Sequence, residues 1–583
     1  MESSEGTLPA PKLFQPKERL TRTRLVSPLV VALCLILLAL ILPPTFILVD
    51  ISLRTTQADG SAGAATLRNY ADLLSSRFFL SALWNTILYA IGSAAVAIAL
   101  GATQALIVER TNAPGRKFVF LGAIISLNIP YVLYVVAWLL ILGRAGPVNH
   151  FIAALTGDPH AGVNIYSLWG MAAIEGVGFS PMTYLLMSSV LRNSDAAFEE
   201  ASMMSGARPL RTFWSISLRM GLPGVFALLL LAFVRAFESF EVPALVGLAG
   251  NINVLTTNIY EATHTTGVPD YGQSAAYAVC LLVIVAGLLV WYNRLSRNAH
   301  QYQSITGKGY RPRVIDLGAW KWLCSALLLL VFALVTALPL AILIFASLQP
   351  FYDGLTAASF GRFTLSNYSE MLAPGSFRDS ILNTLILGAA TASIVVPFTA
   401  LCAWLAARRQ PGAWLLDQIA TAPLVFPAIV MSVAFLYLYV DLPIPLYGTL
   451  LSVIIASASR FMPYGMRFAY AGVLRISVDL EDASSSSGAR RMRTFLQIVV
   501  PLVAPALAGA WLLVFLLSVQ TVSLPLLLVG PGTEVVAVSL FDLWQNGAAP
   551  ELAAMGVLWV ALMSVVTTSF YLIARRYAIS SFS

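Results

Sequence analysis

Long apolar stretches recur along the whole chain, each bounded by short polar segments. Crossing about 30 Å of hydrocarbon at 1.5 Å per residue takes roughly 20 apolar residues in a helix. Stretches of about that size cover residues 28–49, 83–107, 119–143, 166–191, 223–248, 273–293, 321–346, 381–407, 418–440, 447–474, 505–529 and 549–573. This pattern predicts an all-α membrane protein with about twelve transmembrane helices.

The second half of the chain repeats the first at a separation of about 282 to 298 residues. Residues 199–223 align with 481–505 without a gap, and the pair Asn85-Thr86 recurs as Asn383-Thr384. An even number of spans per repeat brings both halves into the membrane in the same sense. We therefore expect two parallel, pseudo-symmetric six-helix domains at 28–293 and 321–583. A cytoplasmic tail at 1–27 and a cytoplasmic linker at 294–320 complete the predicted organisation.

Composition and charge placement support a membrane location. The chain is 58% hydrophobic and 11% charged, a balance that excludes a soluble protein with a charged surface. Of the 35 Lys and Arg residues, 26 fall in alternate loops and the two tails, so the net charge of +7 follows the positive-inside rule and does not indicate nucleic-acid binding. We expect a multi-pass membrane protein with both termini in the cytoplasm.

Several other chemistries find no support in the sequence. The first apolar run exceeds 20 residues, which predicts a membrane anchor and not a cleaved signal peptide. The four cysteines lie in or beside apolar stretches without paired spacing, so we expect neither disulfides nor a metal site. A phosphate-binding G-x-x-x-x-G-K-[ST] motif is absent as well, which predicts a chain that binds no nucleotide cofactor and is not an enzyme.

The strongest repeat predicts two short cytoplasmic helices joined by a bend. Acidic residues near a helix start complement its dipole, and glycine fits the left-handed conformation that ends a helix. The positive-inside rule alone could explain one basic loop, but it does not require the same residue order twice. The residues that define the two loops are Glu200, Ala201, Gly206 and Arg208, and then Asp482, Ala483, Gly488 and Arg490.

This repeated motif resembles the cytoplasmic signature of fused permease subunits in binding-protein-dependent ABC importers. That signature reads Glu-Ala-Ala, three residues, Gly, nine residues, Ile, one residue, Leu-Pro. The first loop has Glu200-Ala201-Ser202, Gly206, Ile216 and Leu218, with Arg219 in place of proline, and the second has Asp482-Ala483-Ser484, Gly488, Ile498, Val500 and Pro501. Spacing is kept in both loops.

The resemblance implies a place in the bacterial inner membrane and two partners besides the lipid bilayer. Each loop would form a coupling helix that seats in one subunit of a cytoplasmic ATP-binding dimer. ATP would be used by that dimer and not by this chain. A separate periplasmic or extracytoplasmic binding protein would capture the substrate.

Ionisable residues within the predicted spans are candidates for the transport pathway, because a charge in hydrocarbon requires a cavity or a partner. Glu238 and Glu241 could attract a cation in the pore, or they could pair with basic groups and hold helices together. The repeat partners of Arg235, Glu238 and Glu241 are uncharged, which predicts an asymmetric pathway. The candidates are Glu175, Arg235, Glu238, Glu241, Arg460 and Arg467.

The cargo is less defined than the architecture. The stretch RAFESFEVPALVG at 235–247 resembles permeases for ferric iron, which we place first, whereas related permeases serve thiamine, polyamines, phosphonates or sulfate. A proton-coupled secondary transporter could also have two parallel halves but would not need two coupling loops. A membrane enzyme would need a nucleophile with its base or a metal cluster, and neither pattern is present.

Overall fold

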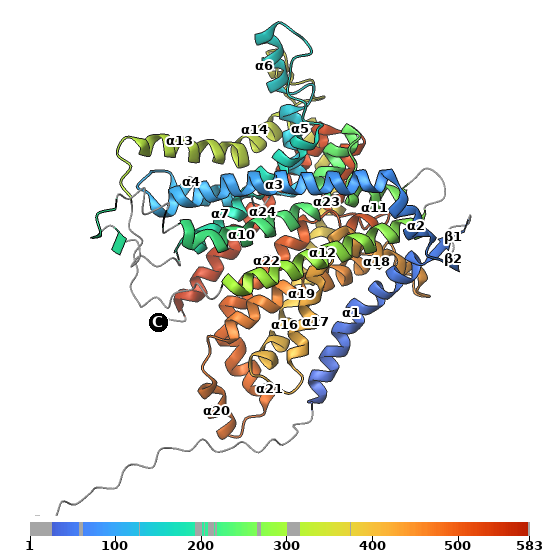
Figure 1. Ribbon diagram of the computed structural model, residues 1–583, viewed down its shortest axis with the longest axis vertical. Coiled ribbons are helices and arrows are strands. Elements are labelled where there is room, and N and C mark those ends of the chain that lie inside the picture. Colours follow the sequence, from blue (N-terminus) through green and yellow to red (C-terminus); the bar gives the residue numbers. More distant parts are fainter. Residues whose placement is uncertain are drawn as a thin grey trace, which may run out of the picture.

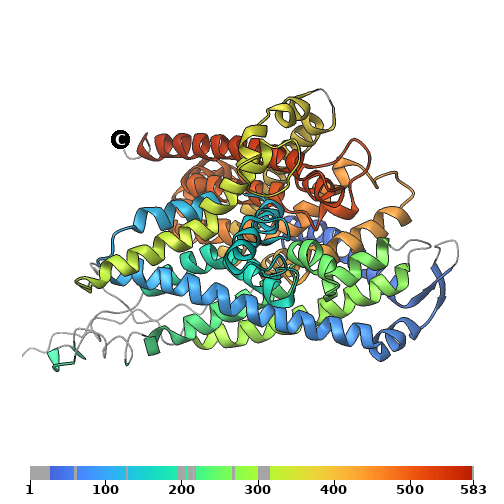
Figure 2. The same cartoon turned by 90° about the horizontal axis from the view of Figure 1, so that it is seen from above.

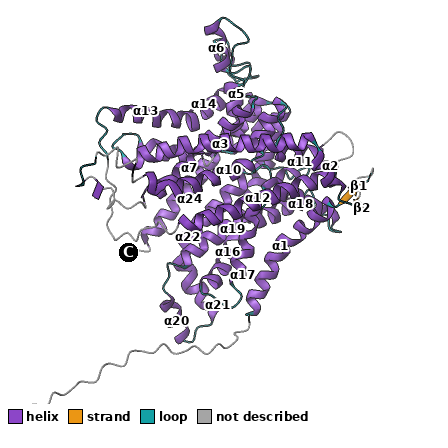
Figure 3. Ribbon diagram, viewed as in Figure 1, coloured by secondary structure: helices purple, strands orange, loops and turns teal. Residues whose placement is uncertain are grey.

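The computed structural model describes residues 26–57, 62–126, 129–192, 201–202, 204–207, 215, 218–264, 270–299, 315–373 and 375–580. Helices make up nearly all of the regular structure in these residues (Figure 3). The two strands, β1 (Arg54–Thr56) and β2 (Ala62–Ala65), pair antiparallel with Arg54 opposite Ala65. The expected all-α class is confirmed.

The first half forms a series of helices that begins with α1 and ends with α12. Its elements are α1 (Pro28–Ser52), α2 (Arg68–Ser75), α3 (Arg77–Arg110), α4 (Arg116–Ser126), α5 (Tyr131–Leu142), α6 (Pro147–Thr156), α7 (Leu168–Arg192), α10 (Leu218–Phe237), the π-helix η2 (Pro243–Gly247), the 3₁₀ turn η3 (Leu248–Gly250), α11 (Leu255–His264) and α12 (Tyr271–Ala299).

The second half repeats this order. Its elements are α13 (Trp320–Phe332), η5 (Ala333–Ala337), α14 (Leu338–Ser347), η6 (Ser359–Arg362), α15 (Ser366–Leu372), α16 (Ser376–Ala407), α17 (Trp414–Thr421), η7 (Ala422–Val425), α18 (Ala428–Asp441), α19 (Leu450–Val473), α20 (Val478–Ser486), α21 (Arg491–Thr494), η8 (Phe495–Val499), α22 (Val500–Gln520), η9 (Pro525–Leu527), α23 (Val536–Gln545) and α24 (Ala549–Ser580).

Length and hydropathy single out fewer spans than the twelve expected. Within the described residues, eight helices are long and apolar enough to cross a membrane, or nine if the bent pair Trp414–Val425 and Ala428–Asp441 counts as one. The predicted spans at 166–191, 223–248 and 447–474 correspond to α7, α10 and α19, which fall outside this set. Charged side chains lower the hydropathy of α7 and α19. The apolar part of α10, Gly224–Phe237, is instead shorter than a full span. The number twelve stays a prediction.

Several predicted spans are interrupted helices. The span expected at 119–143 is divided into α4 and α5, and Pro130 precedes the first residue of α5. At the corresponding place in the second half, the chain bends by 102° between Val425 and Ala428. Proline lacks a backbone N–H and restricts the residue before it, so a continuous helix is disfavoured at both points. The span expected at 223–248 also ends early, at Phe237. In contrast, α12 runs to Ala299, into the expected linker.

The first helix of each half packs against the other half. Helix α1 contacts α17, α18 and α19, whereas α13 contacts α4 and α14 contacts α5. Figures 1 and 2 both show α13 running alongside α4. Hydrogen bonds join the halves at these contacts, from Ser459 Oγ to Leu40 O (3.3 Å) and from Tyr352 OH to Leu140 O (2.7 Å). This exchange ties the two repeats into one body.

The repeat is visible in individual hydrogen bonds. Tyr70 OH lies 2.7 Å from Ser52 Oγ, and the equivalent Tyr368 OH lies 2.6 Å from Ser347 Oγ. Asn69 Nδ2 donates to Ser52 O and Arg54 O, at the end of α1. The equivalent Asn367 Nδ2 donates to Ser347 O and Gln349 O, at the end of α14. Equivalent side chains therefore perform the same structural task in both halves, as expected of a repeat.

Candidate functional site

The chain leaves its helical path after α10, at the first of two acidic residues, Glu238 and Glu241. The helix ends at Phe237, residues 238–240 leave the helical path, and a new helical turn starts at Glu241. The carbonyl end of α10 carries partial negative charge, so Glu238 adds a carboxylate to an end that already favours cations, whereas Glu241 begins the next helical turn, where a carboxylate is favoured. A stable arrangement therefore requires donors or positive groups nearby.

A buried carboxylate on α7 anchors this interruption. Glu175 is 2% exposed, and its Oε2 accepts hydrogen bonds from Tyr89 OH (2.9 Å), Tyr131 OH (2.9 Å) and Ser239 Oγ (3.0 Å). The backbone carbonyl of Ser239 accepts a further bond from Thr256 Oγ1 (2.8 Å). Ser239 is thus held on both sides, which fixes the direction of the flanking Glu238 and Glu241.

Both acidic residues face the second half. Ser523 Oγ donates to Glu241 Oε1 at 2.8 Å, and Arg460 Nη2 lies 3.9 Å from Glu238 Oε1. The Arg460 guanidinium also donates to Pro423 O at 3.2 Å. Among the candidates predicted from the sequence, Glu238, Glu241 and Arg460 come together at the contact between the two halves.

The other two predicted basic residues behave differently. Arg467 is exposed and, within the described part of the chain, makes no ion pair with the two acids that follow α10. Two turns of α19 separate Arg460 and Arg467, so they lie on one face of the helix at different heights, and only Arg460 lies at the height of Glu238. Arg235 has no ion pair within 4.0 Å in the described residues, so it is not the basic partner of Glu238. Its charge still attracts Glu238, Glu175 and Glu241 over a longer range.

The second repeated loop has the predicted helix, bend and helix. Ser477 caps α20 by accepting a bond from Asp479 N, and Gly488 follows with φ of +82°, a value that suits glycine. Asp482, Ala483 and Arg490 are all exposed. In contrast, Glu481 points inward, where Arg408 Nη2 lies 2.7 Å from its Oε1 and Trp404 Nε1 donates to its Oε2 at 3.0 Å. The loop therefore presents an exposed face while its inner face is fixed to α16.

The described part of the first loop has the same geometry. Gly206 has φ of +85°, and Ala207 N donates to Ser202 O at 3.1 Å, as Ala489 N does to Ser484 O at 3.2 Å. Ala201 and Gly206 are exposed. The predicted residues Glu200 and Arg208 lie outside the described residues.

These loops fall within two matches to one protein family. Residues 97–301 and 396–578 each match the binding-protein-dependent transport system inner membrane component. The chain belongs to this family. It carries the domain twice, as the repeat predicted, and it is a permease subunit of an ABC importer in the inner membrane.

Curated relatives of this permease include two proteins with ferric transport names. It is 25% identical over 507 residues to the ferric transport system permease protein FbpB of Actinobacillus pleuropneumoniae, covering 85% of this chain and 70% of the relative. It is 27% identical over 438 residues to the putative ferric transport system permease protein FbpB 1 of Haemophilus influenzae, covering 73% of this chain and 67% of the relative. A putative 2-aminoethylphosphonate transport system permease protein, PhnU of Salmonella choleraesuis, is 27% identical over 44% of this chain and 88% of its own length.

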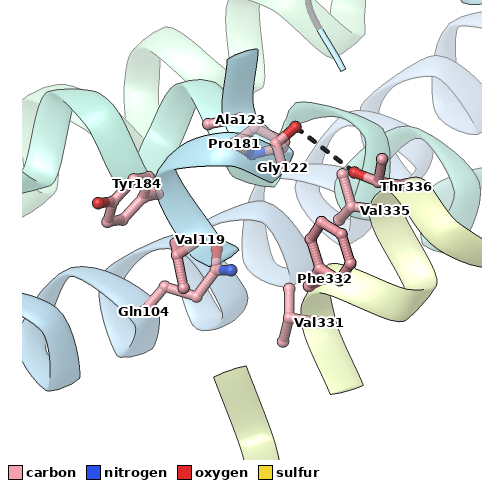
Figure 4. A pocket seen from close by; sticks show the side chains of 10 residues that line it. All are labelled: Gln104, Val119, Gly122, Ala123, Pro181, Tyr184, Val331, Phe332, Val335 and Thr336. Carbon is pink, nitrogen blue, oxygen red and sulfur yellow. Dashed lines mark hydrogen bonds between the residues drawn. The ribbon is translucent and has the colours of Figure 1, made fainter. Parts of the chain in front are cut away.

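The permease also has a small cavity away from the charged residues (Figure 4). It lies between α3, α4 and α7 of the first half and α13 and η5 of the second half. Thr336 Oγ1 donates to Gly122 O at 3.4 Å on one side, and the Oε1 of buried Gln104 has no hydrogen-bond partner among the described residues. The described residues contain no group of three or more His, Cys, Asp or Glu side chains that could hold a metal ion.

Sequence reasoning missed the residues that hold these sites in place. These residues lie far along the chain from the groups that they bind. They are Tyr89, Tyr131 and Trp404, each on a helix, and Arg408, directly after α16. One signal was available, because Arg110 and Arg408 occupy equivalent positions at the ends of the long helices α3 and α16. A basic residue at the same place in both repeats would have indicated a shared role.

Proposed function

We propose that this permease carries ferric iron across the inner membrane by alternating access, driven by ATP hydrolysis in a separate subunit. The observation that carries the choice of cargo is the similarity to FbpB over 85% of the chain. The two acidic residues at the contact between the halves support a cationic cargo. A hard trivalent cation prefers oxygen ligands, and carboxylates on the pathway lower its electrostatic barrier.

Energy and substrate would come from other chains. The exposed faces of the loops around Gly206 and Gly488 would seat in a cytoplasmic ATP-binding dimer, and a binding protein outside the membrane would deliver the cargo. This chain would hold no cofactor of its own. Placement of the basic loops supports cytoplasmic termini and cytoplasmic coupling loops.

Uptake in reconstituted vesicles tests the cargo. Proteoliposomes containing the permease with its ATP-binding subunit would receive the binding protein loaded with radiolabelled ferric iron. We expect uptake that requires ATP on the side of the membrane where the ATP-binding subunit lies. A proton gradient alone should not drive uptake. Uptake driven by the proton gradient without the partner subunit would establish a secondary transporter instead. ATP-dependent uptake of 2-aminoethylphosphonate in place of iron would favour the function named for PhnU.

Cysteine labelling tests the orientation. Single cysteines replace Ala207 and Ala489 in a variant without the four native cysteines, and sealed cells receive a thiol reagent that cannot cross the membrane. We expect no labelling until the cells are opened. Labelling of either position from outside would contradict the parallel arrangement of the halves.

A further inference from the structure

Helix α16 holds the second coupling loop at its cytoplasmic end. Arg408, which follows the last residue of α16, donates through Nε to Glu481 Oε1 at 2.8 Å and through Nη2 to Ile476 O at 3.1 Å. Trp404 adds the bond to the other oxygen of Glu481. The side chains of Arg408 and Glu481 are each 12% exposed, so water screens this ion pair less than a surface pair. Glu481 lies on α20, and the clamp therefore joins α20 directly to α16.

The opposite end of α16 holds a second segment. Asn383 Nδ2 donates to Gly532 O and to Glu534 O, both at 3.1 Å, and Thr384 Oγ1 accepts a bond from Val536 N at 2.8 Å. The segment 532–536 is the connection between the interruption that follows α22 and helix α23. That interruption contains Ser523, the partner of Glu241. One helix thus contacts both the coupling loop and the segment next to the contact between the halves.

The first half repeats part of this arrangement on α3, and Glu199, the residue that corresponds to Glu481, lies outside the described residues. Asn85 Nδ2 donates to Asn253 O at 3.1 Å, and Thr86 Oγ1 accepts from Leu255 N at 3.0 Å. At the other end of the helix, Arg110 donates to Leu191 O at 3.2 Å, as Arg408 donates to Ile476 O. The same side chains at the same places in both repeats argue that the arrangement serves more than local packing.

We propose that Arg408 is a positioning residue that locks the second coupling loop to α16. With this lock in place, α20, α16 and the segment 532–536 move as one body. A helix of 32 residues spans about 48 Å at 1.5 Å per residue, which is long enough to connect the two sides of the membrane. A displacement of the coupling loop therefore reaches the contact between Glu241 and Ser523 through a stiff element. This inference rests on the proposed function of the chain as an ATP-driven permease.

The first test compares Arg408→Gln, Glu481→Gln and the double variant in the complete importer in proteoliposomes. We expect ATP hydrolysis to continue while ferric ions transported per ATP fall about fivefold or more, the lower end of typical allosteric couplings. If the two residues act through each other, the number of ions per ATP in the double variant falls no further than in either single variant. Arg475→Gln is the matched control, because Arg475 is exposed in the same loop. An unchanged ratio in Arg408→Gln, or additive losses in the double variant, would overturn the proposal.

A second variant covers the case in which Arg408→Gln does not assemble. Arg408→Lys keeps the charge but lacks the second nitrogen that lets arginine bind Glu481 and Ile476 O together. We expect assembly and a transport ratio between those of the wild type and Glu481→Gln. A wild-type ratio in Arg408→Lys together with a wild-type ratio in Glu481→Gln would also reject the clamp.

Spin labels provide a readout that does not depend on the cargo. Labels at the exposed positions Ser487, beside α20, and Asp379, in the first turn of α16, report the distance between the two ends of the proposed rigid body. We expect this distance to be the same with and without ATP in the wild type and to broaden in Arg408→Gln. An ATP-dependent change in the wild type would refute rigid-body motion. Failure of the wild type to take up iron, with the distances as expected, would reject the proposed cargo and leave the clamp intact.

Discussion

Ser523 donates a hydrogen bond to Glu241 at 2.8 Å, and these two residues occupy equivalent positions 282 residues apart in the two repeats. Equivalent residues can touch only beside the pseudo-twofold axis that relates the halves. Two glutamates at this place would bring like charges within hydrogen-bonding distance, which disfavours ionisation of both. A glutamate opposite a serine avoids this repulsion and supplies a donor. The loss of symmetry in the sequence at this position therefore has a direct physical reason.

Removing the hydroxyl at this contact should weaken the link between the halves. Glu241 is 6% exposed, so Ser523→Ala leaves Oε1 of a buried carboxylate without its donor. We expect a loss of about 1–3 kcal/mol in stability, measured as a lower midpoint of thermal unfolding in detergent. Ser523→Thr keeps the hydroxyl and is the control. Equal midpoints for the alanine and threonine variants would show that the hydrogen bond contributes nothing.

Neutralising both acids separates a role in transport from a role in assembly. The contact between Glu238 and Arg460 is long, at 3.9 Å, and Arg460 keeps its bond to Pro423 O without it. We therefore expect Glu238→Gln with Glu241→Gln to assemble normally and to hydrolyse ATP in response to loaded binding protein. Ferric uptake should fall about tenfold, equivalent to about 1.4 kcal/mol.

The matched control for this experiment is Arg467→Gln, because Arg467 is exposed two turns further along α19 than Arg460 and makes no ion pair with the two acids in the described residues. We expect it to transport at the wild-type rate. Loss of folded protein in the double glutamine variant would indicate a structural role for the two acids. Full transport by a stable double variant would remove both from the mechanism.

The sequence predicted the architecture because membrane helices and repeats leave strong local patterns. Apolar runs, basic loops and the gapless match of 199–223 with 481–505 each depend on neighbouring residues. The bends were visible only in part, since Pro130 and Pro427 lie inside apolar runs that look continuous by hydropathy. Nothing local to residues 235–241 indicated that the helix ends at Phe237.

Contacts between distant helices could not be predicted from a single sequence. The environment of Glu175 is set by tyrosines on α3 and α5 and by a serine beyond α10, three segments that only the packed bundle brings together. Spacing on α19 correctly related Arg460 and Arg467 by two turns but could not tell which of them faces the acids. The difference depends on how α19 packs, and that information is spread over the whole bundle.

Replacing Glu175 should destabilise the first half more than replacing any one of its donors. Glu175→Leu leaves Tyr89, Tyr131 and Ser239 without their shared acceptor in a buried site. We expect a loss of about 3–5 kcal/mol, because three buried donors lose their acceptor at about 1–3 kcal/mol each. Tyr131→Phe removes one donor and should lose about 1 kcal/mol. Thermal unfolding of the purified permease measures both, and similar midpoints for the two variants would reject the anchoring role.

The glycine bends offer the most direct test of the coupling loops. Gly206 and Gly488 have φ of +85° and +82°, and a Cβ added to either would meet no atom within 4 Å. Any effect of substitution therefore comes from the backbone and not from a clash. A β-branched residue is strongly disfavoured in this left-handed region, whereas asparagine tolerates it. Gly206→Val with Gly488→Val should alter the bend at each glycine.

We expect normal insertion of the valine double variant with ATP hydrolysis uncoupled from transport, measured as fewer ions per ATP in proteoliposomes. Gly206→Asn with Gly488→Asn keeps the bend and should retain coupling. Wild-type transport by the valine double variant would exclude the bends from the coupling mechanism.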